Sequence, residues 1–153
     1  MAFIALLTWL VTASAGLYLL AIWLIEYDRE FQSAAATRLP VPVISAHVLL
    51  AIAGLAVWGT YLFTDTSRLA WIAVATLSVV AVLGLTMAAR WLAVYRSTAQ
   101  ISAPVPAGAR GPATPTPVPP ERHFPVPVVV AHGIFAVATL TLVLLTALHL
   151  SGS

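Results

Sequence analysis

The chain has 153 residues, of which 61% are hydrophobic and 8% are charged, and its mean hydropathy is +0.99. This composition excludes a water-soluble globular domain. Cysteine is absent, which excludes disulfides and thiolate metal sites. The net charge is only +2, and its seven arginines are scattered along the chain. This scatter argues against a nucleic-acid groove.

Four apolar stretches lie at about 3–25, 43–63, 69–94 and 128–148. Each is close to the roughly 20 residues that a helix needs to cross a bilayer. The first stretch lacks a basic flank and is too long for a signal peptide, so we expect it to remain as a helix. The sequence therefore predicts an all-α polytopic membrane protein in which 1–153 form a single membrane domain.

The connections between these stretches differ in kind. Asp65 to Arg68 form a tight turn, so the second and third helices are expected to be antiparallel neighbours. Nine of the eleven prolines fall between Pro104 and Pro127. This composition favours an extended segment without a packed core, and it predicts a flexible cytoplasmic loop at 97–124.

The distribution of arginine predicts the orientation. Six of the seven arginines fall in or beside the two longer loops, which places those loops in the cytoplasm and both termini outside. Lysine and asparagine, which use A-rich codons, are absent. We therefore expect a high-GC prokaryotic gene and a plasma (inner) membrane location. The aromatic residues fit two interfacial belts: Trp9, Trp58, Tyr61 and Trp71 outside, and Trp23, Tyr27, Trp91 and Tyr95 inside.

An internal repeat is the most informative feature of the sequence. PVPVISAH at 40–47 recurs as PVPVVVAH at 125–132, 85 residues later, with six of eight positions identical. WLIEY at 23–27 recurs as WLAVY at 91–95, 68 residues later, and the longer Pro-rich loop accounts for the difference. Such self-similarity indicates duplication of a structural unit. We predict an up-down bundle of two duplicated helical hairpins, related by a pseudo-twofold axis along the membrane normal.

His47 and His132 occupy equivalent positions in this repeat. Each lies seven residues after the first proline of its motif, which is roughly 10 Å into the cytoplasmic half of the bilayer. The second and fourth helices of an up-down bundle are diagonal, so the two imidazoles are expected to face one another. Ionisable residues at such a depth usually face the interior and pair. Gly16 and Gly84, which are equivalent in the repeat, are expected to leave room for a flat group.

Two opposed histidines suit bis-imidazole ligation of a haem iron. We therefore consider His47 and His132 to be candidate metal ligands, haem b the candidate cofactor, and Gly16 and Gly84 candidate cofactor contacts. Arg90, near the cytoplasmic end of the third helix, is a candidate partner for a haem propionate. The arrangement resembles small membrane-embedded b-type cytochromes, although it matches no sequence motif of that class. This resemblance implies an electron carrier or a membrane-anchor subunit of a redox complex, with a quinone as a partner.

Several alternatives remain open from the sequence. The histidines can instead form a quinone or proton site, or only hydrogen-bond a neighbouring helix, and PVPV can simply begin each helix. The chain would then be a non-catalytic four-helix scaffold that uses its Pro-rich loop for interactions, or, as a third option, a small transporter. The partners considered are a membrane redox complex or further copies of the chain in a homo-oligomer. No catalytic motif is present, so an enzyme is not expected. The inner aromatic residues, Trp23, Tyr27, Trp91 and Tyr95, are expected to be interfacial anchors rather than quinone-stacking groups.

Overall fold

The computed structural model describes residues 1–31, 37–101 and 119–151. The described chain is helical, and each of its four long helices is long and apolar enough to cross a membrane. The prediction of an all-helical protein with four membrane-spanning helices is confirmed at this level. The elements are α1 (Ala2–Phe31), α2 (Val41–Thr64), α3 (Ser67–Ile101), the short 3-10 helix η1 (Pro120–His123) and α4 (Val126–Ser151).

Two helices extend well beyond their predicted ends. The prediction ended α1 at 25 and α3 at 94, where the apolar runs stop, whereas the helices continue to Phe31 and Ile101. The added segments contain no proline or glycine, so nothing in their local chemistry breaks the helix. The predicted Pro-rich loop at 97–124 therefore overlaps the end of α3 and η1, and its residues 102–118 lie outside the described part of the chain.

The repeated PVPV motif begins both α2 and α4. The carbonyl of Pro40 accepts from the N–H groups of Val43 and Ile44, and the carbonyl of Pro125 accepts from those of the equivalent residues 128 and 129. The second proline of each motif lies in the first helical turn, where its missing N–H leaves no carbonyl unpaired. The two helices therefore start in the same way, and the histidines lie at the same distance from each start.

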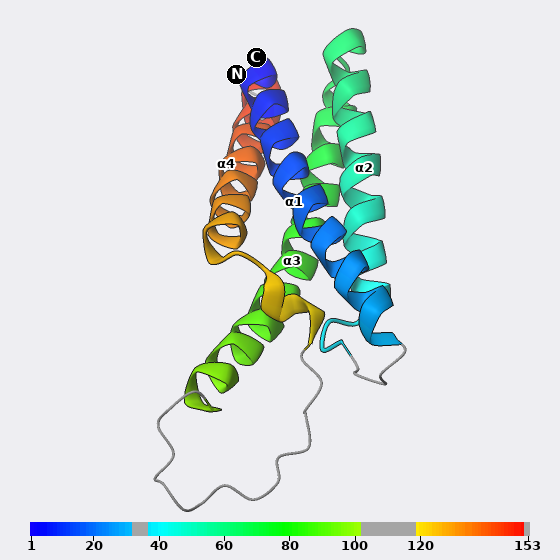
Figure 1. The fold of residues 1–153 in the computed structure, drawn as a ribbon. Helices are drawn as coiled ribbons and strands as arrows, with labels where there is room; N and C mark the ends of the chain where they lie inside the picture. The colour runs from blue at the N-terminus through cyan, green and yellow to red at the C-terminus, as the bar shows by residue number, and fades with distance from the viewer. Residues whose placement is uncertain (32–36, 102–118, 152–153) are drawn as a thin grey trace, which may run out of the picture.

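The helices pack in a defined order around the molecule (Figure 1). The most extensive contacts are between α1 and α4 and between α2 and α3, while α3 also packs on α4, and α1 touches α2 over a smaller area. Among the described residues, no Cα atom of α2 comes within 8 Å of one in α4, and the same holds for α1 and α3. The two termini lie at one end of the molecule, which we call the termini end; η1 lies toward the opposite, loop end.

The turn between α2 and α3 is short. Asp65 has a left-handed backbone, with φ of 52°, and its N–H donates to the carbonyl of Tyr61. Aspartate tolerates this conformation better than most residues because its short polar side chain bonds locally. The turn brings α3 directly back along α2, as the sequence predicted.

Two clusters of buried side chains hold the helices together. The larger one lies toward the termini end and is built around Trp9 and Trp58, which are 3% and 0% exposed. We expected these two residues toward the outer interface, and in the structure their side chains are buried among the helices. Small side chains in the same cluster leave space for the two indoles. They are the buried alanines Ala5, Ala70, Ala73 and Ala147. The smaller cluster lies near the loop end and contains Trp23, Leu39 and Ile44.

Candidate functional site

His47 lies on α2 and contacts α3. Its Nδ1 is 3.0 Å from the carbonyl oxygen of Val80. The ring lies against Gly84, where a Cβ atom would be only 3.2 Å from His47 Cε1. Glycine at this position therefore provides the space that the imidazole occupies.

His132 lies on α4 and makes the corresponding contacts with α1. Its Nδ1 is 2.9 Å from the carbonyl oxygen of Thr12. A Cβ atom at Gly16 would be 3.0 Å from His132 Cε1. We expected both glycines to leave room for a haem, whereas in the structure the group that lies against each glycine is an imidazole.

The two sets of contacts are related by the sequence repeat. Val80 and Gly84 each lie 68 residues after their counterparts, Thr12 and Gly16, which is the spacing that relates the first helices of the two halves. The pairing is reciprocal, because the histidine of each half is held by the glycine and carbonyl of the other half. The same hydrogen bond and the same close approach thus occur twice.

These hydrogen bonds determine the tautomer of both rings. A backbone carbonyl can only accept, so Nδ1 of each histidine must carry the hydrogen that it donates. A neutral imidazole with a proton on Nδ1 has its lone pair on Nε2. Metal-ligating histidines commonly use their second ring nitrogen in this way, and the hydrogen bond fixes the ring and increases its basicity. In their neutral form, both histidines therefore carry the free lone pair on Nε2.

The two imidazoles lie next to each other, with ring centroids 6.4 Å apart and planes at 53°. Two imidazoles bound to opposite sides of one metal ion would have centroids about 6.4 Å apart, given a metal–nitrogen bond of about 2.0 Å and about 1.2 Å from nitrogen to centroid. The observed separation is close to this value. No group of three or more metal-ligating side chains gathers in the described residues, so they do not supply the usual ligand set of zinc.

Arg90 lies on α3, six residues beyond Gly84 toward the loop end. Six helical residues span about 9 Å. Its side chain is exposed, and one of its guanidinium N–H groups donates to the carbonyl oxygen of Arg38 at 3.2 Å. The remaining donors of this planar group suit a carboxylate. Arg90 therefore connects α3 to the segment that precedes α2.

A pair of threonines lies beside the histidines. Thr12 Oγ1 and Thr139 Oγ1 are 3.4 Å apart, and each hydroxyl also lies within 2.8 Å of a carbonyl four residues earlier in its own helix. Thr139 is 1% exposed. Thr12 therefore contacts α4 at two residues. Its carbonyl oxygen accepts from His132, and its hydroxyl lies next to that of Thr139.

The loop end contains a buried acid that the sequence analysis missed. Glu121, in η1, is 0% exposed. Its Oε1 accepts from the backbone N–H of Arg38 at 2.6 Å, and its Oε2 accepts from Thr37 Oγ1 at 3.1 Å. Thr37 Oγ1 in turn accepts from Trp23 Nε1 at 3.2 Å. Glu121 therefore ties η1 to the segment before α2 and, through Thr37, to α1.

The other two histidines lie apart from the pair. His123 is in η1, its side chain is 46% exposed, and its Nδ1 is 3.9 Å from Glu26 Oε2. His149 is exposed in the last turn of α4. Neither has a histidine at the position 85 residues earlier, where Arg38 and Thr64 lie.

Comparisons with known proteins give no further assignment. No family model, curated protein or solved structure matches the chain.

We predict that Glu121→Ala destabilises the protein. The Arg38 N–H and the Thr37 hydroxyl would lose their buried acceptor, which is expected to lower the free energy of unfolding by about 2 kcal/mol. Glu121→Gln keeps one acceptor oxygen and should lose less. Thermal unfolding of the purified protein, followed by circular dichroism, measures both. Arg122→Ala, at an exposed position of η1, is the control, and equal melting temperatures for Glu121→Ala and Arg122→Ala would contradict the prediction.

Proposed function

We propose that this chain binds one haem b between His47 and His132 and acts as an electron-transfer protein or membrane-anchor subunit of a redox complex. The observation that carries the proposal is the reciprocal histidine arrangement. Both Nδ1 atoms donate to carbonyls on a neighbouring helix, and the ring centroids are 6.4 Å apart. A haem held in this way would supply one-electron oxidation and reduction.

The residues of the chain have separate roles in this proposal. His47 and His132 bind the iron, and their bonds to the carbonyls of Val80 and Thr12 orient the rings. Gly16 and Gly84 seat the imidazoles. Arg90 pairs with a propionate, as its exposed guanidinium allows.

We further propose that the fold is an up-down bundle formed by two duplicated hairpins. Equivalent helix pairs support this: α1 packs on α4 as extensively as α2 packs on α3, and among the described residues no Cα atom of α2 comes within 8 Å of one in α4. The repeat-related contacts of the two histidines support the same relationship. The pseudo-twofold axis would pass between the two imidazoles.

A scaffold role is the second candidate. Each histidine hydrogen bond joins two helices, His47 joining α2 to α3 and His132 joining α4 to α1. Such bonds stabilise helix association in a membrane without any cofactor. The Pro-rich loop that would bind partners in this alternative lies largely outside the described residues.

The visible absorption spectrum of protein purified from haem-replete cells distinguishes these two functions. A bis-histidine haem protein should show a Soret band and, after reduction, a sharpened alpha band, with about one haem per chain. A colourless protein that is folded by circular dichroism would remove the haem proposal and favour the scaffold.

We propose a prokaryotic plasma membrane location, with both termini outside and the loop end in the cytoplasm. The arginine distribution supports this orientation. A phosphatase fused after Ser153 should then be active, whereas one inserted within residues 107–117 should be inactive. The opposite pattern would invert the orientation without affecting the histidine site.

A further inference from the structure

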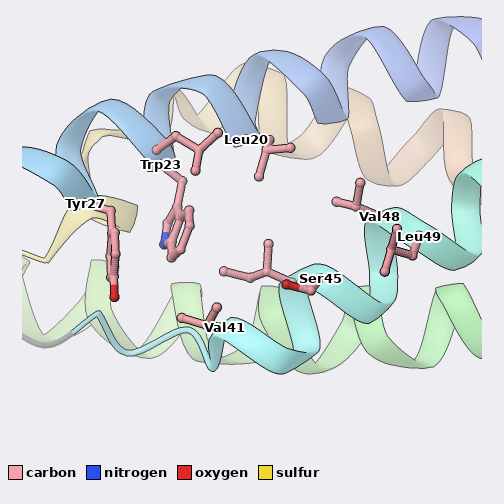
Figure 2. Close-up of a pocket in the computed structure, with 9 residues that line it drawn as sticks. Leu20, Trp23, Tyr27, Val41, Ser45, Val48 and Leu49 are labelled. Carbon is pink, nitrogen blue, oxygen red and sulfur yellow. The ribbon is translucent and has the colours of Figure 1, made fainter.

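A cleft lies between α1 and α2 in the half of the molecule nearer the loop end (Figure 2). Its volume is about 490 Å³, which is within the range of small-molecule sites. The residues that line it are mainly apolar. They are Leu20, Trp23, Leu24 and Tyr27 of α1, and Val41, Ile44, Ser45, Val48 and Leu49 of α2.

The cleft lies where the two halves of the repeat differ. The contacts of α1 with α4 match those of α2 with α3 in extent, as the repeat requires. The interface of α1 with α2 should likewise match that of α3 with α4, but α3 and α4 pack over a larger area. The cleft therefore lies in the α1–α2 interface, which is packed less extensively than the equivalent α3–α4 interface.

The cleft contains an unpaired hydroxyl group. Among the helical serines and threonines whose side chains the structure describes, those after the first residue of a helix donate to a carbonyl of their own helix, whereas the exposed Ser45 does not. A hydroxyl without a partner is unfavourable in an apolar surrounding. The equivalent residue in the other half is Val130. Ser45 therefore adds to the cleft a hydrogen-bond donor that the second half lacks.

One wall of the cleft is a fixed aromatic surface. Trp23 and Tyr27 stack with ring centroids 4.7 Å apart and planes at 20°. The indole is held in place because Trp23 Nε1 donates to Thr37, which is bound to Glu121. We expected Trp23 to be an interfacial anchor, but it is 5% exposed and lines the cleft.

The cleft is separate from the face of α2 that carries His47. At 100° per residue, the lining residues of α2 centre about 130° around the helix axis from His47. The His47 ring instead faces α3. Ser45 and Val48 nevertheless lie within two residues of His47 on the same helix. The cleft therefore lies close to the histidine pair along α2 but on a different face of this helix.

We propose that the cleft binds the head group of an isoprenoid quinone. Ser45 donates to one quinone carbonyl, and the ring lies against the indole of Trp23. The tail leaves toward the lipid past Leu24 and Leu49, which are 52% and 66% exposed. An aromatic ring with carbonyl acceptors and an apolar tail matches these three features, whereas an acyl chain would leave the Ser45 hydroxyl unpaired. The site is inferred from the cleft itself, and the proposed haem would make the bound quinone its neighbour.

The test uses the full chain in nanodiscs and a photoreactive azido-ubiquinone with a short tail. Labelling should fall on peptides of α1 and α2 and should be prevented by excess unmodified quinone. Ser45→Leu fills the cleft and should weaken binding at least tenfold. Ser45→Ala removes only the hydrogen bond and should weaken it about fivefold. The matched controls are Ser78→Ala and Ser78→Leu, since Ser78 is an exposed serine that bonds to its own helix.

The other outcomes are equally informative. Labelling spread over all four helices, or equal affinity of the Ser45 and Ser78 variants, would show partition into the bilayer only and would overturn the proposal. Loss of haem in Ser45→Leu without any quinone labelling of the wild type would assign the cleft to the porphyrin and also overturn it. A colourless protein that is still labelled at α1 and α2 would refute the haem and retain the quinone site.

Discussion

Replacing either His47 or His132 by alanine is expected to abolish the low-spin haem spectrum. A six-coordinate iron loses one axial ligand in both variants, so both should give a high-spin spectrum or lose the haem. The two effects should be of similar size, because the two histidines make equivalent contacts. Absorption and electron paramagnetic resonance spectra of the purified variants measure the change of spin state.

The remaining two histidines provide the controls for this experiment. His123→Ala and His149→Ala should retain the wild-type spectrum, since both side chains are exposed and away from the ring pair. Equal losses in all four variants, together with lower helical content, would indicate misfolding. A wild-type spectrum in His47→Ala or His132→Ala would exclude that residue as a ligand.

Substituting Gly16 or Gly84 by valine is expected to displace the imidazole that each glycine seats. The first added carbon alone would lie 3.0 Å from His132 or 3.2 Å from His47, and the valine methyl groups add further volume. Overpacking of this kind costs about 1–3 kcal/mol. We therefore expect a lower melting temperature and a weaker or altered haem spectrum in both variants.

Two glycines with open surroundings are matched controls for this prediction. Neither Gly59 nor Gly133 has any atom within 4 Å of an added Cβ, and Gly133 is the immediate neighbour of His132. Gly59→Val and Gly133→Val should keep the spectrum and the melting temperature close to those of the wild type. If Gly133→Val lowered the melting temperature and altered the spectrum as much as Gly16→Val, the effect of Gly16→Val could not be attributed to displacement of the imidazole.

The sequence predicted the parts of this structure that depend on local pattern and on repetition. Hydropathy located four helices, and the prolines located the starts of α2 and α4. The repeat identified His47 and His132 as a pair, and their rings lie 6.4 Å apart. The helix ends were less accurate, because hydropathy reports where apolar residues stop rather than where a helix breaks.

Contacts between distant segments could not be predicted in the same way. Glu121 accepts from the backbone N–H of Arg38, 83 residues earlier, and a backbone donor leaves no pattern in a sequence. The sequence also did not predict that each glycine contacts the histidine of the other half. The alignment relates Gly16 to Gly84 but does not show which histidine each glycine contacts. The burial of Trp58 within a cluster of residues from several helices was likewise not predicted.

The crossing of the two histidine contacts has a genetic consequence. Under the proposed duplication, Gly16 and His47 descend together, yet each contacts a residue of the second half. Compensating changes for a substitution at residue 84 should therefore arise at residue 47 rather than at residue 132. A single ancestral hairpin would have had neither contact alone and would have acquired both at once by pairing with an identical copy of itself.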